Sequence, residues 1–282
     1  MMLDKIVIKA PAKINLFLYV LNKRDDGYHN IKSGVTFINL YDEINIIKSN
    51  SMSIQYSGTF APSSGFYADC IIKKTLKFIN LYKAVNLEIH VIKNIPVKAG
   101  LGSASSNSAG LIKGLEKLQI IKPIVDFQSF GSLGADIPVF LYGKDSLVGG
   151  IGDQIIKKQF PKYYFLVVKP EISFSTKDMY KKIQKNFLKN DKPFKQHNDL
   201  IHDYDNGNDF EKIIINEKNE IKKLLNFLSN IEECIFARMT GTGSCCFAVF
   251  EKLDIAHKAQ QIFRKKFPKL WSFVGENSKL VA

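Results

Sequence analysis

A stretch of small residues between a predicted strand and a predicted helix constrains this chain more than any other feature. Apolar and polar residues alternate from Val85 to Ile92, which predicts a half-buried strand that ends at Pro96. Glycine, alanine and serine then fill most of residues 99–110, and leucines at helical spacing begin at Leu111. Small residues let backbone N–H groups approach phosphate oxygens, and a helix opening at Ser105-Ser106 adds about half a positive charge. The stretch therefore predicts an anion site, although an ordinary capped strand–helix turn has a similar composition.

The spacing of the glycines excludes the two commonest nucleotide loops. Neither G-x-x-x-x-G-K-[ST] nor G-x-G-x-x-G fits the stretch that begins at Gly100. Serine hydroxyls at the start of the helix can cap it, or they can bind a phosphate or its Mg²⁺.

The composition is that of a globular protein, and it leaves several partners open. The 282 residues, 45% of them hydrophobic and 24% charged, suffice for one large domain or two ordinary ones. A net charge of +13 is compatible with nucleic acid, an anionic membrane or an anionic small molecule. The basic residues are scattered in a sequence rich in Lys, Asn, Ile and Phe throughout, which favours compositional bias and argues against nucleic-acid binding.

The cysteines and the N-terminus indicate a cytoplasmic protein. The four cysteines show no metal-binding spacing and are expected to be reduced thiols: Cys70, Cys234, Cys245 and Cys246. Asp4, Lys5 and Lys9 interrupt any signal peptide, and no apolar run is long enough to span a membrane.

The first strand carries an unusual pair of polar residues. The pattern predicts a strand from Ile6 to Leu21, interrupted by Ala10-Pro11-Ala12. Alternation places Lys13 and Asn15 on one face together with Phe17 and Tyr19. A lysine there is more often a surface residue with a buried stem, but the apolar neighbours make this one a candidate site residue.

Two further positions are candidates. Asp136 lies between a Gly-Ala turn and an apolar segment, where an aspartate is either a helix cap or a proton acceptor. Tyr28-His29 follow a predicted hairpin turn, where they are either an aromatic pair of the hairpin or a stacking and hydrogen-bonding site for a planar base.

The remaining elements suggest two units. Helices are predicted over 68–82 and 124–133, and the pattern restarts near Phe160 as strand, helix, helix, strand, helix, strand. Helical spacing runs from Phe210 to Leu228, Ser175-Thr176 is expected to cap a helix, and Lys181 to Gly207 is expected to be a mobile surface segment. The second unit should be a small α+β sandwich.

Five motifs spread along the chain resemble those of one family. The loop reads as P-x-x-x-G-L-x-S-S-x-A with a two-residue insertion, and Pro11 to Leu16 is similar to P-A-K-x-N-L, both typical of the galactose/homoserine/mevalonate/phosphomevalonate (GHMP) kinases. Arg24 to His29 resembles the R-x-D-G-Y-H signature of one branch of that superfamily, and G-A-D-I-P-V-F from Gly134 and T-G-T-G from Thr240 match its other motifs.

The resemblance implies an α+β, two-domain GHMP kinase fold. Residues 1–157 would form a ribosomal-protein-S5-like, ATP-binding domain, and residues 158–282 a ferredoxin-like domain. It implies transfer of the γ-phosphoryl of ATP, with Mg²⁺, to the 2-hydroxyl of 4-(cytidine 5′-diphospho)-2-C-methyl-D-erythritol in the non-mevalonate isoprenoid pathway. It also implies a small-molecule substrate, no nucleic-acid or membrane partner, no metal site made by the protein alone, and a monomer or weak homodimer.

The resemblance assigns roles to individual residues. Asp136 would accept the hydroxyl proton, and Lys13 beside it would neutralise charge. Asn15, Tyr28, His29, Thr176 and Tyr180 would bind the substrate. ATP would be bound by the loop residues Pro96, Val97, Lys98, Ala99, Gly100, Leu101, Gly102, Ser103, Ala104, Ser105 and Ser106. Another GHMP kinase, acting on mevalonate or homoserine, is the nearest alternative, and an RNA-binding S5-like protein is a more distant one.

The chain departs from the family at four positions. Ser103-Ala104 replaces a usual Gly-Gly pair, Lys98 replaces a small residue, and Cys70 replaces an asparagine near the expected adenine pocket. A side chain at any loop position that needs a positive φ would strain the loop and affect ATP binding.

Overall fold

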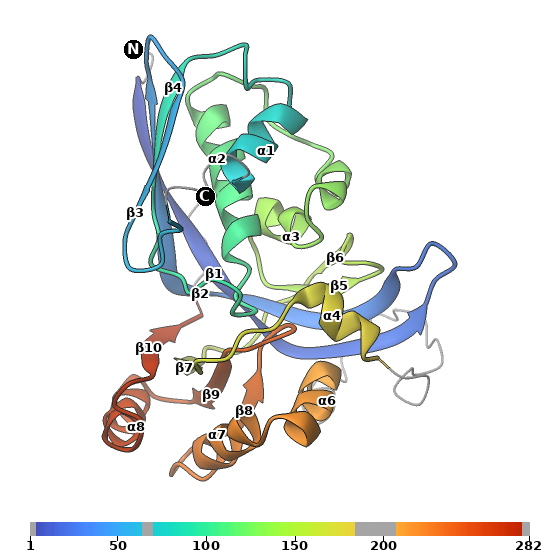
Figure 1. Ribbon diagram of the computed structural model, residues 1–282, viewed down its shortest axis with the longest axis vertical. Coiled ribbons are helices and arrows are strands. Elements are labelled where there is room, and N and C mark those ends of the chain that lie inside the picture. The colour runs from blue at the N-terminus through green and yellow to red at the C-terminus, as the bar shows by residue number, and fades with distance from the viewer. Residues whose placement is uncertain (1–3, 64–69, 184–206, 278–282) are drawn as a thin grey trace.

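The computed structural model describes residues 4–63, 70–183 and 207–277, which form two β-sheets with helices on their outer faces (Figure 1). In the first sheet the strand order is β3-β4-β2-β5-β6, and β1 pairs antiparallel with β2. Its strands are β1 (Lys5–Lys23), β2 (His29–Lys48), β3 (Ser53–Ser57), β4 (Leu87–Ile92), β5 (Ser146–Gly149) and β6 (Gln154–Lys157). The associated helices are α1 (Ile71–Phe78), α2 (Ser103–Lys117), the 3₁₀ helix η2 (Gln128–Ser132) and α3 (Ile137–Tyr142).

The second sheet has the order β10-β7-β9-β8 and is antiparallel throughout. Its elements are β7 (Tyr164–Lys169), α4 (Thr176–Lys181), α6 (Asp209–Glu217), α7 (Asn219–Ser229), β8 (Phe236–Met239), β9 (Cys246–Phe250), α8 (Leu253–Lys266) and β10 (Trp271–Glu276). In sequence order the four strands are therefore arranged 4-1-3-2, which is the ferredoxin-like order that was expected.

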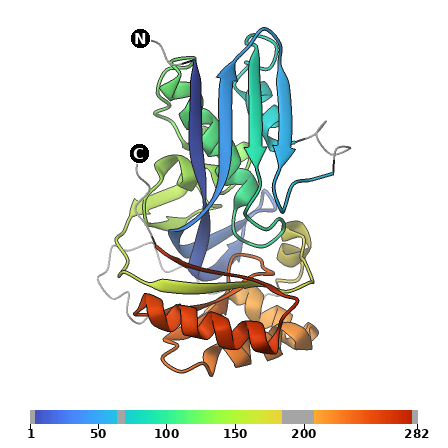
Figure 2. The same cartoon turned by 90° about the vertical axis from the view of Figure 1, so that its left-hand side faces the viewer.

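The two sheets pack against each other through a shared core, and in Figure 2 the second sheet and its helices lie below the upright strands of the first. The core between the sheets includes Ile14, Leu16 and Ile38 from the first sheet and Phe165 and Phe247 from the second. Separate cores lie under α1 and α2, under α3, and beneath the helices of the second sheet. The apolar alternation predicted these buried faces, as in β4, where Leu87, Ile89 and Val91 are all buried.

The long strand β1 differs from the prediction because it contains a β-bulge. The strand continues through Pro11, with an irregular register there, and a second register shift leaves Leu16 as an extra residue between Asn15 and Phe17. The bulge moves Phe17 to the face that carries Leu16, in the core between the sheets, so the predicted shared face of Asn15 and Phe17 is wrong. Lys13 and Asn15 consequently face the cleft described below without aromatic neighbours from their own strand.

Other boundaries differ for identifiable reasons. Helix α2 begins at Ser103, two residues earlier than expected, because Gly102 has a left-handed backbone (φ +72°) and takes the cap position. Only η2 forms within the helix predicted over 124–133, and the helical spacing of 210–228 divides into α6 and α7 at Lys218. The sequence reading missed β8. Most of the segment 181–207, expected to be mobile, lies outside the described residues.

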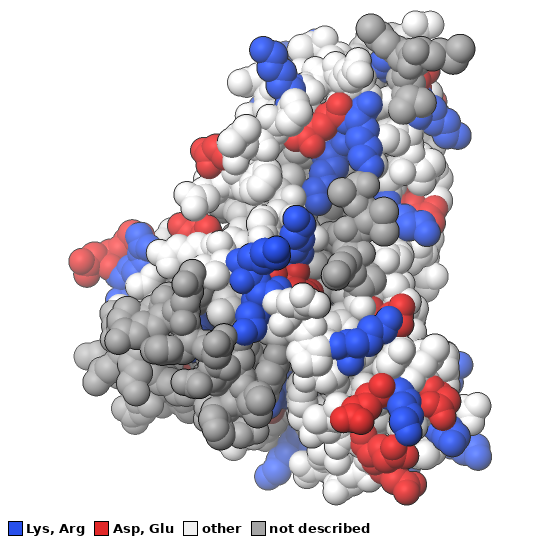
Figure 3. All heavy atoms as spheres, turned by 180° about the vertical axis from the view of Figure 1, so that it is seen from behind, with Lys and Arg blue, Asp and Glu red and all other residues white. Residues whose placement is uncertain are grey.

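Charged side chains of both signs are spread over the face shown in Figure 3. None of the described helices is both long and apolar enough to cross a lipid bilayer.

Candidate active site

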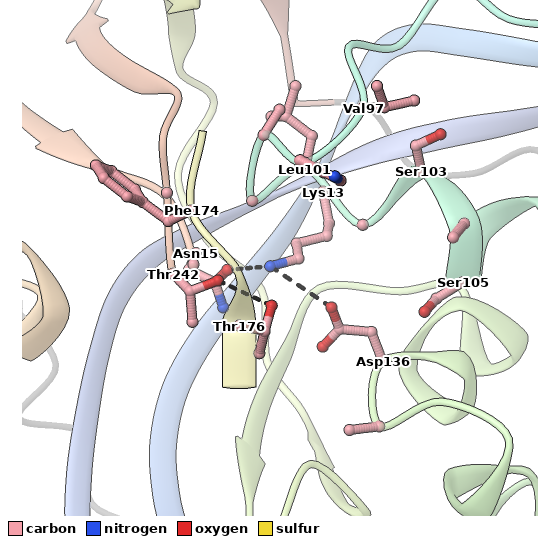
Figure 4. A pocket seen from close by; sticks show the side chains of 18 of the residues that line it. Lys13, Asn15, Val97, Leu101, Ser103, Ser105, Asp136, Phe174, Thr176 and Thr242 are labelled. Atoms are coloured by element: carbon pink, nitrogen blue, oxygen red, sulfur yellow. Dashed lines mark hydrogen bonds and ion pairs between the residues drawn. The ribbon is translucent and has the colours of Figure 1, made fainter. Parts of the chain in front are cut away.

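A cleft of about 1080 Å³ lies where β1, the loop before α2, the start of α3 and the turn before β9 meet (Figure 4). It brings together predicted site residues that are distant in sequence. Those that line it are Lys13, Asn15, Asp136, Thr176, Tyr180 and every residue from Pro96 to Ser105. Tyr28, His29 and Ser106 are not among the lining residues.

The loop before α2 approaches its neighbours so closely that two positions require glycine. Gly100 has φ +75°, and a Cβ there would lie 2.1 Å from the Thr240 carbonyl oxygen. Gly102 has φ +72°, and its Cβ would lie 2.7 Å from the Phe140 ring. Because Gly102 has no side chain to cap α2, the first N–H groups of the helix have no side-chain cap and are suited to an anion.

The departures from the family pattern have different consequences. Ser103 and Ala104 lie in the first turn of α2, so neither requires a left-handed backbone. Lys98 does have a positive φ, +50°, in a conformation that a lysine adopts less readily than glycine. Strain from these departures is therefore confined to Lys98. Cys70 lies at the N-terminus of α1 and lines the cleft.

The two hydroxyls at 105 and 106 have different surroundings. Ser105 lines the cleft, whereas the Ser106 hydroxyl donates a hydrogen bond to the Pro11 carbonyl oxygen at 2.6 Å and is buried. Ser106 thus fastens α2 to β1. Ser106 was predicted to contact ATP, but in this structure its hydroxyl does not reach the surface of the cleft.

Lys13 and Asp136 meet inside the cleft. The Lys13 Nζ lies 3.7 Å from the nearer Asp136 carboxylate oxygen and also donates to the Asn15 side-chain oxygen. The Lys13 side chain is 5% exposed, whereas that of Asp136 is 45% exposed. Asp136 takes the N-cap position of α3, but its side chain makes no capping hydrogen bond. Of the two interpretations left open by the sequence, the helix cap is therefore not the one observed.

A second lysine–aspartate pair lies beneath the loop and was missed by sequence reasoning. The Lys93 Nζ contacts Asp42, Ser103 and Asn107, and both members of the pair are buried. Burial lowers the pKa of Lys93, and the charge of Asp42 partly offsets this. Asp42 lies beside Glu43 in a region with further polar residues, and Lys93 directly follows a strand, so no local signal relates the two residues.

The turn from Thr240 to Gly243 attaches the second sheet to this site. The Thr240 hydroxyl accepts from the Asn15 backbone N–H at 3.0 Å and donates to the Gly100 carbonyl oxygen at 3.4 Å. The Asn208 side-chain amide supports the turn by donating to the Met239 and Gly241 carbonyl oxygens. Near the turn, the Thr176 hydroxyl lies 3.1 Å from that of Thr242. Loop, strand and turn are thus held as one unit.

The predicted base-binding residues are only partly assembled. The His29 and Tyr180 rings are stacked with their centroids 5.3 Å apart, and Phe210 packs edge-on against Tyr180. Burial raises the pKa of Tyr180, and the charge of Asp136 adds to this effect. Burial also lowers the pKa of His29, which favours the neutral imidazole. Tyr28 is 61% exposed and lies outside the cleft lining.

Among the described residues no cluster of three or more His, Cys, Asp and Glu side chains could hold a metal ion. The cleft instead offers the Asp136 carboxylate and the Ser105 hydroxyl beside the loop.

Both halves of the chain match known kinases. Residues 67–144 match the GHMP kinases N terminal domain, and residues 180–269 match the GHMP kinases C terminal family. The chain belongs to the GHMP kinases, a class of small-molecule kinases that use ATP.

The relatives identify the branch of that class. The chain is 37% identical to the 4-diphosphocytidyl-2-C-methyl-D-erythritol kinase of Francisella philomiragia over 265 residues, covering 90% of each chain. It is 31% identical to the enzyme of that name from Haemophilus ducreyi, covering 99% of this chain and 96% of the relative. A crystal structure of 4-(cytidine 5′-diphospho)-2C-methyl-D-erythritol kinase has the same fold, with a TM-score of 0.79 at 22% identity over 97% of this chain and all of the other. The expected two-domain GHMP kinase fold is confirmed.

Proposed function

We propose that this chain transfers the γ-phosphoryl group of ATP to the 2-hydroxyl of 4-(cytidine 5′-diphospho)-2-C-methyl-D-erythritol, as the names of its relatives suggest. The observation that carries the proposal is the approach of Asp136 and Lys13 beside a glycine loop at a helix N-terminus. That arrangement provides a proton acceptor, a cation and an anion site within one cleft, which phosphoryl transfer requires.

The loop and α2 would position ATP. The first N–H groups of α2 and the backbone of the loop favour phosphate oxygens, and the bonds from Thr240 and Asn15 fix the loop against β1. Mg²⁺ in kinases is commonly held through one or two carboxylates together with substrate phosphates. Asp136 is assigned below to the proton, so the Ser105 hydroxyl is the group of the cleft that would hold the ion together with the ATP phosphates, and the ion would supply charge neutralisation on the phosphates.

Asp136 would act as the general base. Its carboxylate is partly exposed to the cleft and is not used as a helix cap, so a substrate hydroxyl can reach it. The substrate oxygen forms a bond to the γ-phosphorus, the bond from that phosphorus to the ADP oxygen breaks, and the hydroxyl proton passes to Asp136. Lys13 would offset the negative charge shared between the carboxylate and the transferring group.

The cytidine end of the substrate would be bound near His29 and Tyr180. Because these rings already stack on each other, a base can stack on an outer face of the pair or separate the rings. Tyr28 would have to turn inward from its exposed position to contribute. These roles, the cytoplasmic location, the oligomeric state and the absence of nucleic-acid and membrane partners stay predictions.

The proposal is tested by measuring ADP release by the purified chain with different phosphoryl acceptors. The cytidylyl substrate should support turnover, whereas mevalonate, homoserine and galactose should not. Turnover with one of those three alone would favour the alternative that this is a different GHMP kinase.

In the same assay Tyr28→Ala should raise KM for the cytidylyl substrate roughly tenfold to a hundredfold, because base–aromatic stacking contributes about 1–3 kcal/mol. An unchanged KM would remove Tyr28 from the substrate site.

A further inference from the structure

A buried hydroxyl on β2 connects to the Lys13–Asp136 pair. Ser33 is completely buried, and it lies opposite Leu18 just past the bulge in β1. Its hydroxyl donates to the Phe17 carbonyl oxygen at 2.6 Å and accepts from the Asn15 side-chain nitrogen at 2.8 Å. The Asn15 side-chain oxygen in turn accepts from Lys13.

The hydrogen atoms in this chain of contacts can be assigned by elimination. A carbonyl oxygen only accepts, so the one proton of the Ser33 hydroxyl is committed to Phe17. Ser33 can then only accept from Asn15, and the Asn15 amide must present its nitrogen to Ser33 and its oxygen to Lys13. A flipped amide would place two donors against each other at Lys13.

This assignment determines the direction of the Lys13 ammonium group. A lysine has three N–H donors. In the described structure one points to Asn15 and another faces Asp136, so a third is left for a group in the cleft. We propose that Ser33 is a positioning residue for phosphoryl transfer: by fixing the Asn15 amide it orients Lys13 toward Asp136 and the transferring group. The proposal rests on the proposed function of Lys13 and Asp136.

A direct contact between Ser33 and substrate is the competing explanation. Ser33 borders the cleft, but it has no exposed surface, and both the proton and the acceptor side of its hydroxyl are engaged by Phe17 and Asn15. A ligand of the substrate would change KM, whereas a residue that orients Lys13 should change kcat.

The same strand offers a matched control. Thr36 is also fully buried on β2, and its hydroxyl donates at 2.8 Å to a carboxylate oxygen of Asp145, which is not part of the Lys13 network. Thr36→Val and Ser33→Ala each remove a buried hydroxyl from β2. Both should lower the unfolding temperature, but only Ser33→Ala should affect turnover.

The experiment is a double-mutant cycle in the full chain, with kcat and KM measured by ADP release with the cytidylyl substrate. Ser33→Ala should lower kcat roughly tenfold with KM changed by less than about twofold. Ser33→Thr, which keeps the hydroxyl, should restore kcat, and Thr36→Val should stay near wild type. In an Asn15→Ala background, Ser33→Ala should have almost no further effect, because its route to Lys13 is already removed.

Several results would overturn the proposal. The first is a kcat for Ser33→Ala equal to that of Thr36→Val. The second is that Ser33→Ala lowers kcat by the same factor with and without Asn15. The third is a raised KM at constant kcat. If Ser33→Ala does not fold, Ser33→Cys, with a weak acceptor of similar size, should give an intermediate kcat, and a wild-type kcat would count against the proposal. If wild type turns over only mevalonate, homoserine or galactose, the proposed function fails, and the same cycle with that acceptor still tests Ser33.

Discussion

Two lysine–aspartate pairs lie at the same cleft, which Lys13, Asp136 and Lys93 line, and their surroundings differ. The Lys93 and Asp42 side chains are 5% and 0% exposed, and Asp42 also accepts from the Ser103 hydroxyl, the Asn107 amide and the backbone N–H groups of residues 94 and 95. Lys13 is equally buried, but its partner Asp136 is 45% exposed and 3.7 Å away.

The difference separates a structural carboxylate from the one proposed to react. All the acceptor capacity of Asp42 is used to join β2, the loop and α2, so it has none for a substrate. Asp136 has a single ion-pair partner among the described residues and faces open space. The same two residue types can therefore fasten a loop or take a proton, depending on how many hydrogen bonds they already make.

The largest effect is expected from replacing the exposed carboxylate. Asp136→Asn keeps the size of the side chain but loses its basicity, so kcat should fall about 10²–10⁴-fold. Asp136→Asn also removes the counter-charge of the buried Lys13 ammonium, but the carboxylate is half-exposed, lies 3.7 Å away and does not cap α3, so the unfolding temperature should fall less than it does for Asp42→Asn. Steady-state ADP release and calorimetric binding of both substrates measure this. A kcat near wild type would show that Asp136 is not the base.

The same pair should behave as a unit in catalysis. Lys13→Met should lower kcat to a similar extent by removing the cation beside Asp136. Residues that act together give non-additive losses, so the double variant Lys13→Met/Asp136→Asn should be little worse than the poorer single variant. Losses that multiply in the double variant would mean that the two residues act independently.

The buried pair should show the opposite behaviour. Asp42→Asn makes the same chemical change, but it leaves the Lys93 ammonium buried without a counter-charge. The free energy of unfolding should fall by about 3–5 kcal/mol, as is typical when one partner of a buried pair is removed. Urea unfolding of Asp42→Asn and Asp136→Asn, side by side, measures the contrast. Equal stability of the two variants would remove the distinction between the pairs.

The smallest effect is expected at Ser103, one of the departures from the family pattern. Its hydroxyl donates to Asp42 at 2.9 Å and accepts from Lys93, so Ser103→Ala should cost about 1 kcal/mol of unfolding free energy. ATP affinity should change little, because the hydroxyl is directed to the buried pair. If Ser103→Ala leaves the stability unchanged but raises the Kd for ATP, the hydroxyl contacts the nucleotide and not the buried pair.

Local periodicity and motif spacing predicted much of this molecule. They located the buried face of β4, the Ser175 cap and the loop that lines the cleft. They could not predict the bulge at Leu16, because Phe17 is apolar and fits either face of the strand. Nor could they pair Asp42 with Lys93, since only the tertiary fold joins residues 51 positions apart.

The prediction that Lys13 approaches Asp136 came from the family resemblance and not from the pattern of the residues. The spacing alone left Asp136 as either a cap or a base, and only the three-dimensional structure shows that the cap bond is not made. The start of α2 was misplaced for a related reason, because the sequence does not show that Gly102 has a left-handed backbone and approaches Phe140 closely.

The attachment of the Thr240 turn to β1 has a consequence for how the protein is made. Asn15 and Thr240 are 225 residues apart, and Arg238 reaches back over 222 residues to donate to the Leu16 carbonyl oxygen. During synthesis the first half of the chain leaves the ribosome long before these partners exist, so the loop before α2 cannot be held in place until the second half has been made. Contacts of such long sequence separation form late because closing large loops costs entropy. Enzymatic activity is therefore a reporter of the last stage of folding, after both sheets have docked.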